Sequence, residues 1–203
     1  MEYFVSILVG YLLGSSSMTY YLGRLKNIDV RNHGTGNLGA SNAAVTMGWG
    51  AAVLVAVHDI GKAILAVVLA RWLFPGVAYL GELAGVACVV GHMFPFYLGF
   101  RGGKGLASFI GMTIALDIRV AVGAVILLVL VTVISDFIAL GTVTLTVVVP
   151  LALWLVTGDM LVLLALLPAT AVMVFKHLDN LKRIAQGKEI GLRSTIKGEH
   201  RVK

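Results

Sequence analysis

Residues 91–105 read Gly-His-Met-Phe-Pro-Phe-Tyr-Leu-Gly-Phe-Arg-Gly-Gly-Lys-Gly, and this stretch joins two apolar blocks of the chain. Glycine lets the backbone curl until successive N–H groups point inward, and such a concavity binds anions. Lys104 adds a positive charge to the glycines at 102, 103 and 105. The stretch therefore predicts a turn that returns the chain to the membrane and binds a phosphate at its surface.

The composition of the chain indicates a membrane protein. Hydrophobic residues make up 59% of its 203 residues and charged residues only 13%, with a mean hydropathy of +0.95. A soluble domain of this length could not bury so much apolar surface. We therefore expect an all-α polytopic membrane protein with a single domain over residues 1–203. The lone cysteine, Cys88, cannot form an internal disulfide.

The apolar blocks predict the number of membrane helices. They lie at residues 3–22, 43–74, 77–98, 106–134, 137–156 and 160–175. A helix needs about 20 residues to cross a hydrocarbon core of ~30 Å. Asp117-Ile118-Arg119 divides the fourth block into 106–116 and 120–134. The result is about seven transmembrane helices, some of them short or broken.

Charge predicts the orientation. Eight of the 16 lysines and arginines fall within the last 28 residues, and smaller clusters lie at 24–31 and 101–104. Basic residues beside membrane spans mark the cytoplasmic face. We expect the N-terminus outside, the C-terminus inside and a cytoplasmic active site. Attraction to anionic lipid headgroups explains the net charge of +6, so the bilayer is the expected partner and nucleic acid is not.

Glycine pairs at 10/14 and 81/85 have the small-xxx-small spacing that lets helix backbones approach closely. Packing within the molecule is the favoured reading of these pairs, and dimerisation is the alternative.

Two glycine motifs resemble nucleotide-binding sequences but lack the context. Residues 34–39 match G-x-G-x-x-G, yet no strand precedes them and no βαβ unit surrounds them. The Lys104 loop lacks both a glycine at position 98 and the hydroxyl residue that follows the lysine of a phosphate-binding P-loop. No His, Cys or carboxylate cluster has metal-ligand spacing, so we expect neither cofactor nor metal.

A polar loop precedes the second apolar block. Its candidate substrate-binding residues are Thr35, Gly36, Asn37, Ser41 and Asn42. Free N–H groups at a helix start bind anions, but the same residues also suit a simple capped turn between spans. The segment alone favours neither reading.

Two pairs of polar residues have helical spacing. Asp59 and Lys62 lie inside an apolar block, where an ion pair that positions the site is the favoured reading and substrate contact the alternative. His177 and Asn180 share a helix face after the last block. Imidazole and amide groups can act as base or oxyanion donor, or can be ordinary polar boundary residues.

Taken together, these segments resemble the bacterial membrane glycerol-3-phosphate acyltransferases that use acyl phosphate as donor. The resemblance covers nearly the whole chain and rests on residues 14–42, 91–105 and 177–189. It implies acyl transfer to the 1-hydroxyl of glycerol 3-phosphate, which gives lysophosphatidic acid and phosphate in phospholipid biosynthesis. It also implies a multi-pass protein of the bacterial inner membrane. A soluble enzyme that produces acyl phosphate is a candidate partner, which a catalytically impaired member of the family would recruit to the membrane.

The resemblance assigns roles to the candidate residues. Catalytic roles fall to His177, Asn180 and Lys104, and substrate binding to Thr35, Gly36, Asn37, Ser41, Asn42, His92, Gly102, Gly103, Gly105 and Thr142. The chain departs from the family pattern at Val45, where an arginine is expected, and Arg31 or Arg101 are candidates to replace it. The alternatives are a transporter of a small anionic or phosphorylated solute and a paralogue with another acceptor.

Overall fold

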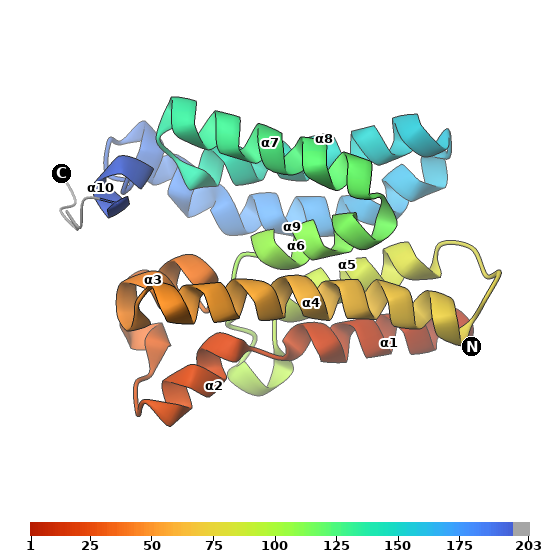
Figure 1. The fold of residues 1–203 in the computed structure, drawn as a ribbon, viewed down its shortest axis with the longest axis horizontal. Helices are drawn as coiled ribbons and strands as arrows, with labels where there is room; N and C mark the ends of the chain where they lie inside the picture. The colour runs from red at the N-terminus through yellow and green to blue at the C-terminus, as the bar shows by residue number, and fades with distance from the viewer. Residues whose placement is uncertain (197–203) are drawn as a thin grey trace. The chain divides into compact units, whose positions relative to one another are not determined.

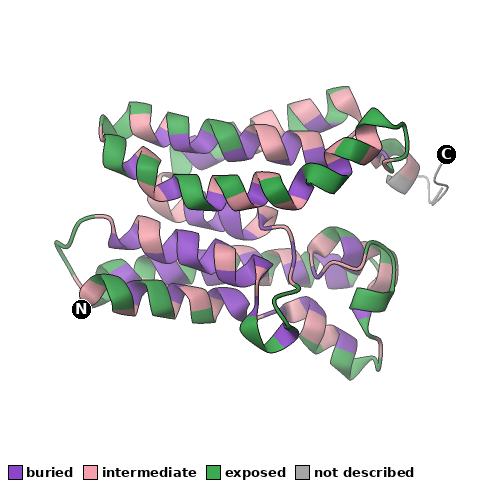
Figure 2. Cartoon of the chain, turned by 180° about the vertical axis from the view of Figure 1, so that it is seen from behind, coloured by how far each residue is buried: buried purple, intermediate pink, exposed green. Residues whose placement is uncertain are grey.

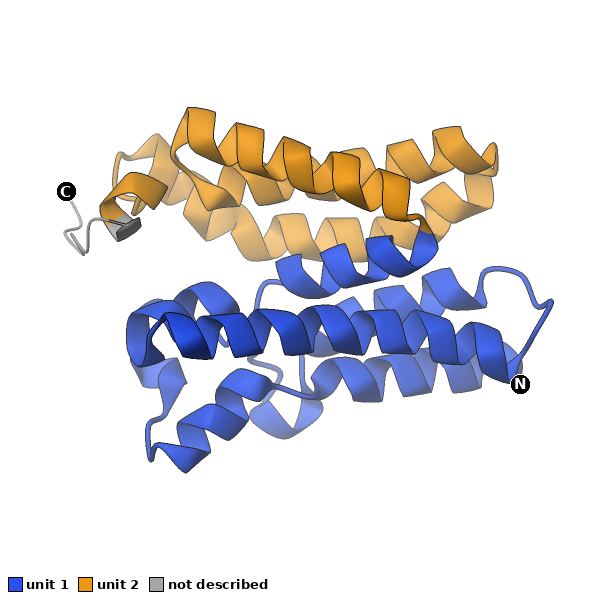
Figure 3. Ribbon diagram, in the orientation of Figure 1, with its two compact units in different colours: residues 1–116 blue, residues 117–203 orange. Residues whose placement is uncertain are grey.

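The computed structural model describes residues 1–196, and within them the chain is helical and contains no strand. The chain divides into two compact units, residues 1–116 and 117–203 (Figure 3). The elements of the first unit are α1 (Glu2–Ser15), α2 (Met18–Leu25), η1 (Val30–Asn32), α3 (Ala40–Met47), α4 (Trp49–Leu73), α5 (Leu80–Met93), η2 (Phe96–Leu98) and α6 (Leu106–Leu116). Those of the second are α7 (Ile118–Ser135), α8 (Ile138–Thr157), α9 (Met160–Ala185) and α10 (Leu192–Ile196) (Figure 1).

Five helical stretches within residues 1–196 are long and apolar enough to cross a membrane. They are α4, the stretch Leu80–Leu98 that begins with α5, and α7, α8 and α9. The helix α6 is apolar but shorter. The prediction of an all-helical membrane protein is confirmed at this level. That the whole chain acts as a single domain stays a prediction.

The first apolar block does not form one continuous helix as expected from residues 3–22. It breaks after α1, where Ser17 caps α2 by accepting a hydrogen bond from the backbone N–H of Tyr20 (3.3 Å). The ammonium of Lys62 donates to the carbonyl of Ser16 (2.7 Å). Since that carbonyl lies at the break, a buried lysine from α4 stabilises the irregular backbone there.

The predicted division of the fourth block is confirmed. The carboxylate of Asp117 caps α7 by accepting from the backbone N–H groups of Arg119 (2.8 Å) and Val120 (3.3 Å). The same carboxylate pairs with the Arg119 guanidinium (2.7 Å). These interactions hold the pKa of Asp117 at about 2, chiefly through the hydrogen bond from the Arg119 side chain. A helix therefore ends and another begins at this residue.

The glycine pairs pack within the first unit, as favoured from the sequence. A Cβ atom at Gly14 would lie 2.0 Å from the Cys88 carbonyl oxygen, and one at Gly10 would lie 2.3 Å from that of Ala84. Only glycine allows α1 to approach α5 so closely. Gly85 in turn packs against Met112 of α6.

The second unit is a run of helices in which α8 contacts both α7 and α9. Exposed residues lie along its helices (Figure 2). Among them are Ile126, Val129, Leu130 and Val133 of α7, large apolar residues that are each more than half exposed. Such a surface suits lipid rather than water. The predicted basic cluster extends to Lys197, Arg201 and Lys203, which lie outside the described residues.

Candidate active site

The predicted polar loop is organised around Asn42, a fully buried residue near the start of α3. Its side-chain oxygen accepts from the backbone N–H of Thr35 (2.9 Å). Its amide donates to the carbonyls of Val30 (3.3 Å), His33 (3.1 Å) and Asn37 (2.8 Å). Since these bonds occupy the whole amide, Asn42 shapes the loop.

The hydrogen bonds of Asn42 bring together Thr35, Gly36 and Asn37. The Asn37 amide donates to the Thr35 hydroxyl (2.7 Å), and its oxygen accepts from the N–H of Gly39 (2.8 Å). Gly36 has a φ of 72°, a conformation that side chains disfavour. Ser41 is exposed beside this loop. The segment is thus a capped turn, and it also presents polar groups to solvent.

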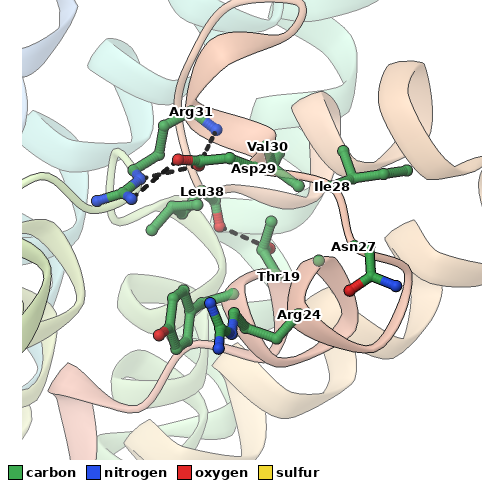
Figure 4. A pocket seen from close by; sticks show the side chains of 10 residues that line it. Thr19, Arg24, Asn27, Ile28, Asp29, Val30, Arg31 and Leu38 are labelled. Atoms are coloured by element: carbon green, nitrogen blue, oxygen red, sulfur yellow. Dashed lines mark hydrogen bonds and ion pairs between the residues drawn. The ribbon is translucent and has the colours of Figure 1, made fainter.

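Two pockets adjoin this loop. The first, of about 390 Å³, lies between α2 and the loop and is lined by Thr19, Tyr20, Gly23, Arg24, Asn27, Ile28, Asp29, Val30, Arg31 and Leu38 (Figure 4). The Thr19 hydroxyl donates to the Leu38 carbonyl (2.8 Å) and so ties the loop to α2. None of the predicted catalytic or substrate-binding residues lines this pocket, but Arg31, a candidate to replace the expected arginine, does.

The second pocket, of about 300 Å³, is lined by Asp29, Arg31, Asn32, Gly36 and Arg101. Arg31 makes a two-point contact with Asp29, through Nε to Oδ1 and Nη2 to Oδ2, each at 2.9 Å. That contact lowers the pKa of the Asp29 carboxyl below its usual value. Arg101 forms no ion pair with any described residue. Arg31 and Arg101 together leave the pocket with an excess positive charge.

The Lys104 loop folds back onto His92 at the end of α5. The N–H of Gly102 donates to the Met93 carbonyl (3.1 Å) and that of Gly103 to the His92 carbonyl (3.2 Å). This corrects the expectation that these two N–H groups point inward to an anion. The two glycines are required instead by close approach, since a Cβ at Gly103 would lie 2.1 Å from Nε2 of His92. Gly105 follows with a φ of 94° and leads into α6.

His92 belongs to a buried polar cluster between α4 and α5. Asp59 pairs with Lys62 at 2.7 Å, and the Lys62 ammonium lies 3.0 Å from Nδ1 of His92. His58 adds contacts to Asp59 (3.3 Å) and to the Ser16 hydroxyl (3.0 Å). The predicted Asp59–Lys62 ion pair is therefore confirmed. The contact of Lys62 with His92 was missed, because residues 30 apart in sequence give no periodic signal.

In the second unit, His177 and Asn180 lie on one face of α9, and both are buried. Nδ1 of His177 lies 2.8 Å from the Met173 carbonyl. A carbonyl only accepts, so Nδ1 carries a proton and donates it to this carbonyl. The sequence left base and oxyanion donor open for His177, and the contact with Met173 fixes the direction of the ring without deciding between these roles.

Glu189 connects two polar residues of α9. Its carboxylate accepts from the Asn180 amide (2.5 Å) and from Nε of Arg183 (2.6 Å). Thr142, also a predicted site residue, lies in α8 with 1% of its surface exposed, and its hydroxyl donates to the Ile138 carbonyl (2.8 Å). Both contacts hold these side chains in fixed positions.

Helices apolar enough to cross a membrane, beside a pocket with an excess of guanidinium groups, fit an integral membrane protein that binds a phosphate-bearing molecule. The chain belongs to the glycerol-3-phosphate acyltransferase family, whose model matches residues 4–187.

Relatives and solved structures agree with this assignment. The chain is 36% identical over 190 residues to "Glycerol-3-phosphate acyltransferase" of Halalkalibacterium halodurans, covering 90% of this chain and 92% of the relative. The protein of the same name from Rubrobacter xylanophilus is 37% identical, with coverage of 90% and 92%. The glycerol 3-phosphate form of PlsY (YgiH), "an integral membrane glycerol 3-phosphate acyltransferase", superposes with a TM-score of 0.90 at 28% identity, over 99% of this chain and 100% of that one. Its lysophosphatidic acid form gives 0.85 at 28% identity, over 94% and 95%.

Proposed function

We propose that the chain transfers a fatty acyl group from acyl phosphate to the 1-hydroxyl of glycerol 3-phosphate, and that lysophosphatidic acid and inorganic phosphate leave. The observation that carries this proposal is the pocket lined by Gly36, Arg31 and Arg101. It lies beside the loop whose path is set by the hydrogen bonds of Asn42. Guanidinium groups recognise phosphate with directed hydrogen bonds. Membership of the acyltransferase family supplies the reaction class.

The reaction needs little covalent help from the protein. The hydroxyl oxygen of the acceptor attacks the acyl carbonyl carbon, the bond from that carbon to the phosphate oxygen breaks, and its electron pair leaves with phosphate. An acyl phosphate is already activated, so positioning and charge stabilisation are the main tasks of the enzyme. We assign the phosphate groups to Lys104, Arg101 and the loop residues Thr35, Asn37 and Ser41.

We assign the acceptor hydroxyl to His177 and Asn180. Because the Met173 carbonyl holds the proton of His177 on Nδ1, Nε2 accepts the hydroxyl proton as the new ester bond forms. Asn180, held by Glu189, is assigned to stabilising the developing oxyanion. The Thr142 hydroxyl donates to the Ile138 carbonyl. This residue is assigned to substrate binding on the family resemblance alone.

Arg101, and not Arg31, compensates for Val45. Val45 is 44% exposed on α3, and its side chain would touch a Cβ placed at Gly34, so the position faces the loop. The charge of Arg31 is neutralised by Asp29 at two points. Arg101 lines the same pocket without such a partner among the described residues.

In the membrane, we propose seven embedded helical segments, with α1 and α6 as the short ones, the N-terminus outside and the C-terminus in the cytoplasm. The basic residues at 24–31, 101–104 and 176–193 then share the cytoplasmic face. The test places single cysteines at Lys188 and Val77 in a Cys88→Ser background. A membrane-impermeant thiol reagent added to intact cells should label position 77 and spare position 188, and the reverse pattern would overturn the orientation.

The function is tested with purified protein, acyl phosphate and glycerol 3-phosphate. Phosphate release that depends on the acceptor, together with formation of lysophosphatidic acid, is the expected result. Release with another phosphorylated acceptor alone would indicate a different substrate. Solute flux into vesicles without release would replace the proposal by transport. Co-purification with a soluble enzyme that produces acyl phosphate, whose product is this donor, tests the expected partner.

A further inference from the structure

We propose that Lys62, anchored by Asp59, fixes the His92 ring with its proton on Nε2, so that His92 presents an N–H donor to a phosphate group at the Lys104 loop. The inference rests on the proposed function for the identity of the phosphate. It makes Asp59 and Lys62 positioning residues that act through His92.

The side chains of the cluster are largely buried. Asp59, Lys62 and His92 are 2%, 6% and 7% exposed. The Lys62 ammonium donates to Asp59 Oδ1 and to the Ser16 carbonyl, each at 2.7 Å. The carboxylate offsets the loss of water at this buried ammonium group. The ammonium is thus fixed next to His92.

The position of the His92 proton follows from donor and acceptor roles. An ammonium group only donates, so at 3.0 Å from Nδ1 it must donate to the ring lone pair. A neutral imidazole has one proton, which then lies on Nε2. In the other tautomer Nδ1–H would donate to Asp59, over a longer distance of 3.4 Å. The Nδ1–H group and the Lys62 ammonium would then be two donors only 3.0 Å apart.

The Nε2 atom faces the glycine loop. A Cβ at Gly103 would lie 2.1 Å from Nε2 and 2.7 Å from Cε1, so the edge of the ring occupies the space that a side chain would need. The loop's own amides at 102 and 103 already donate to carbonyls of Met93 and His92. No described residue accepts a hydrogen bond from Nε2. The imidazole therefore supplies the donor that these two amides cannot.

The tautomer decides the sign of the interaction. Phosphate oxygens accept hydrogen bonds, so an Nε2–H group attracts them. With the proton on Nδ1 the ring would turn a lone pair toward the same oxygens and repel them. Loss of a hydrogen bond to a charged group weakens binding about tenfold to a hundredfold.

The direct test is ¹⁵N NMR of the purified protein labelled at its histidine rings, with the His92 signals assigned from a His92→Gln variant. We expect a protonated Nε2 and an unprotonated Nδ1, and a shift of the Nε2 signal on titration with inorganic phosphate. A protonated Nδ1 in the wild-type protein would overturn the inference. So would an Nε2 signal that does not respond to phosphate at saturating concentration.

Variants test the role of Lys62. Lys62→Met should move the proton to Nδ1, which then donates to Asp59, and should raise the inhibition constant of inorganic phosphate about tenfold to a hundredfold. If the single variant fails to fold, the double variant Asp59→Asn/Lys62→Met replaces it, because it leaves no unpaired buried charge. The double variant should show the same rise in the inhibition constant of phosphate. Unchanged phosphate affinity in a folded double variant would contradict the proposal.

Two further variants separate positioning from structure. His92→Gln keeps an N–H group near the place of Nε2 and should retain most of the phosphate affinity, whereas His92→Asn should lose it. His58→Asn is the matched control, since His58 contacts Asp59 and Ser16 and makes no hydrogen bond to His92 among the described residues. It should leave the His92 proton on Nε2 and the affinity within about twofold. If phosphate binding behaves as stated but no acyl group is transferred, the proposed function fails and this inference stands.

Discussion

Asn42 and Thr35 are joined by a hydrogen bond of 2.9 Å from the Thr35 backbone N–H to the buried Asn42 side chain. The same amide donates to three carbonyls of the preceding loop. One side chain therefore sets the path of the residues that border the Arg101 pocket. The relationship separates residues that shape the site from those that bind substrate.

Asn42→Ala should destabilise the protein by about 2–5 kcal/mol, because several buried backbone groups lose their partners at once. Activity should fall with stability. Thermal unfolding in detergent micelles checks the first effect. Ser41→Ala is the matched comparison, because Ser41 is exposed on the same helix. It should leave the unfolding temperature unchanged and raise KM for glycerol 3-phosphate. Equal stability of the two variants would contradict the structural role of Asn42.

Arg101→Gln should raise KM for glycerol 3-phosphate about tenfold or more, since a charge-assisted hydrogen bond to phosphate is lost. Arg31→Gln should have a smaller effect, because Asp29 already occupies that guanidinium. Initial rates at varied acceptor concentration distinguish the two. The opposite order would assign the phosphate to Arg31.

The Asp29–Arg31 pair should hold throughout the neutral pH range. The pKa of Asp29 is lowered by the hydrogen bond from Arg31. A carboxyl whose pKa is lowered in the folded protein contributes stability above its unfolded value, and that contribution is lost as the pH falls through the folded value. Arg31→Gln should therefore leave the shape of the activity profile between pH 6 and 8 unchanged relative to the wild type. A new inflection in that window would show that the pair titrates there.

His177→Asn should lower kcat about 10²–10⁴-fold with little change in KM, the range for loss of a general base. Asparagine can still donate to the Met173 carbonyl, which preserves the local contact of His177, but it offers no basic nitrogen at the place of Nε2. Single-turnover rates with saturating substrates measure the effect. A variant with more than a tenth of the wild-type kcat would show that another group, such as the leaving phosphate, takes the proton.

Glu189→Ala should lower kcat about tenfold, because Asn180 loses the carboxylate that orients it. Asp179→Ala is the control, because Asp179 is the carboxylate next to Asn180 on α9. Its contact with Lys182 is 3.9 Å long and exposed, so kcat should not change. Similar losses in both variants would mean that removal of a negative charge near Asn180 lowers kcat, and not the loss of its orientation.

Gly103→Ala should reduce activity severely, because its methyl group would enter the space of the His92 ring. Gly61→Ala is the matched control, since a Cβ there meets no atom within 4 Å and alanine favours the helix. Gly103→Ala should therefore show lower activity and a lower unfolding temperature than Gly61→Ala. A fully active Gly103→Ala protein would mean that the loop can move away from His92.

The sequence by itself determined the helical membrane class, the break at Asp117 and the approach of Gly10 and Gly14 to another helix. These features depend on local composition and on periodic spacing, which can be read along one segment. It also placed the loop at residues 34–42 and the Asp59–Lys62 pair, because both are short-range patterns.

Only the tertiary structure decided what each polar group does. The Gly102 and Gly103 amides donate to carbonyls at the end of α5, and the break at Ser16 depends on Lys62 from α4. Asn42 is committed to four backbone groups, and Arg31 to Asp29. A hydrogen-bonding group in the sequence shows only what it can bind. Whether it is still available to a substrate depends on which partners folding brings within hydrogen-bonding distance, and local sequence patterns do not show those partners.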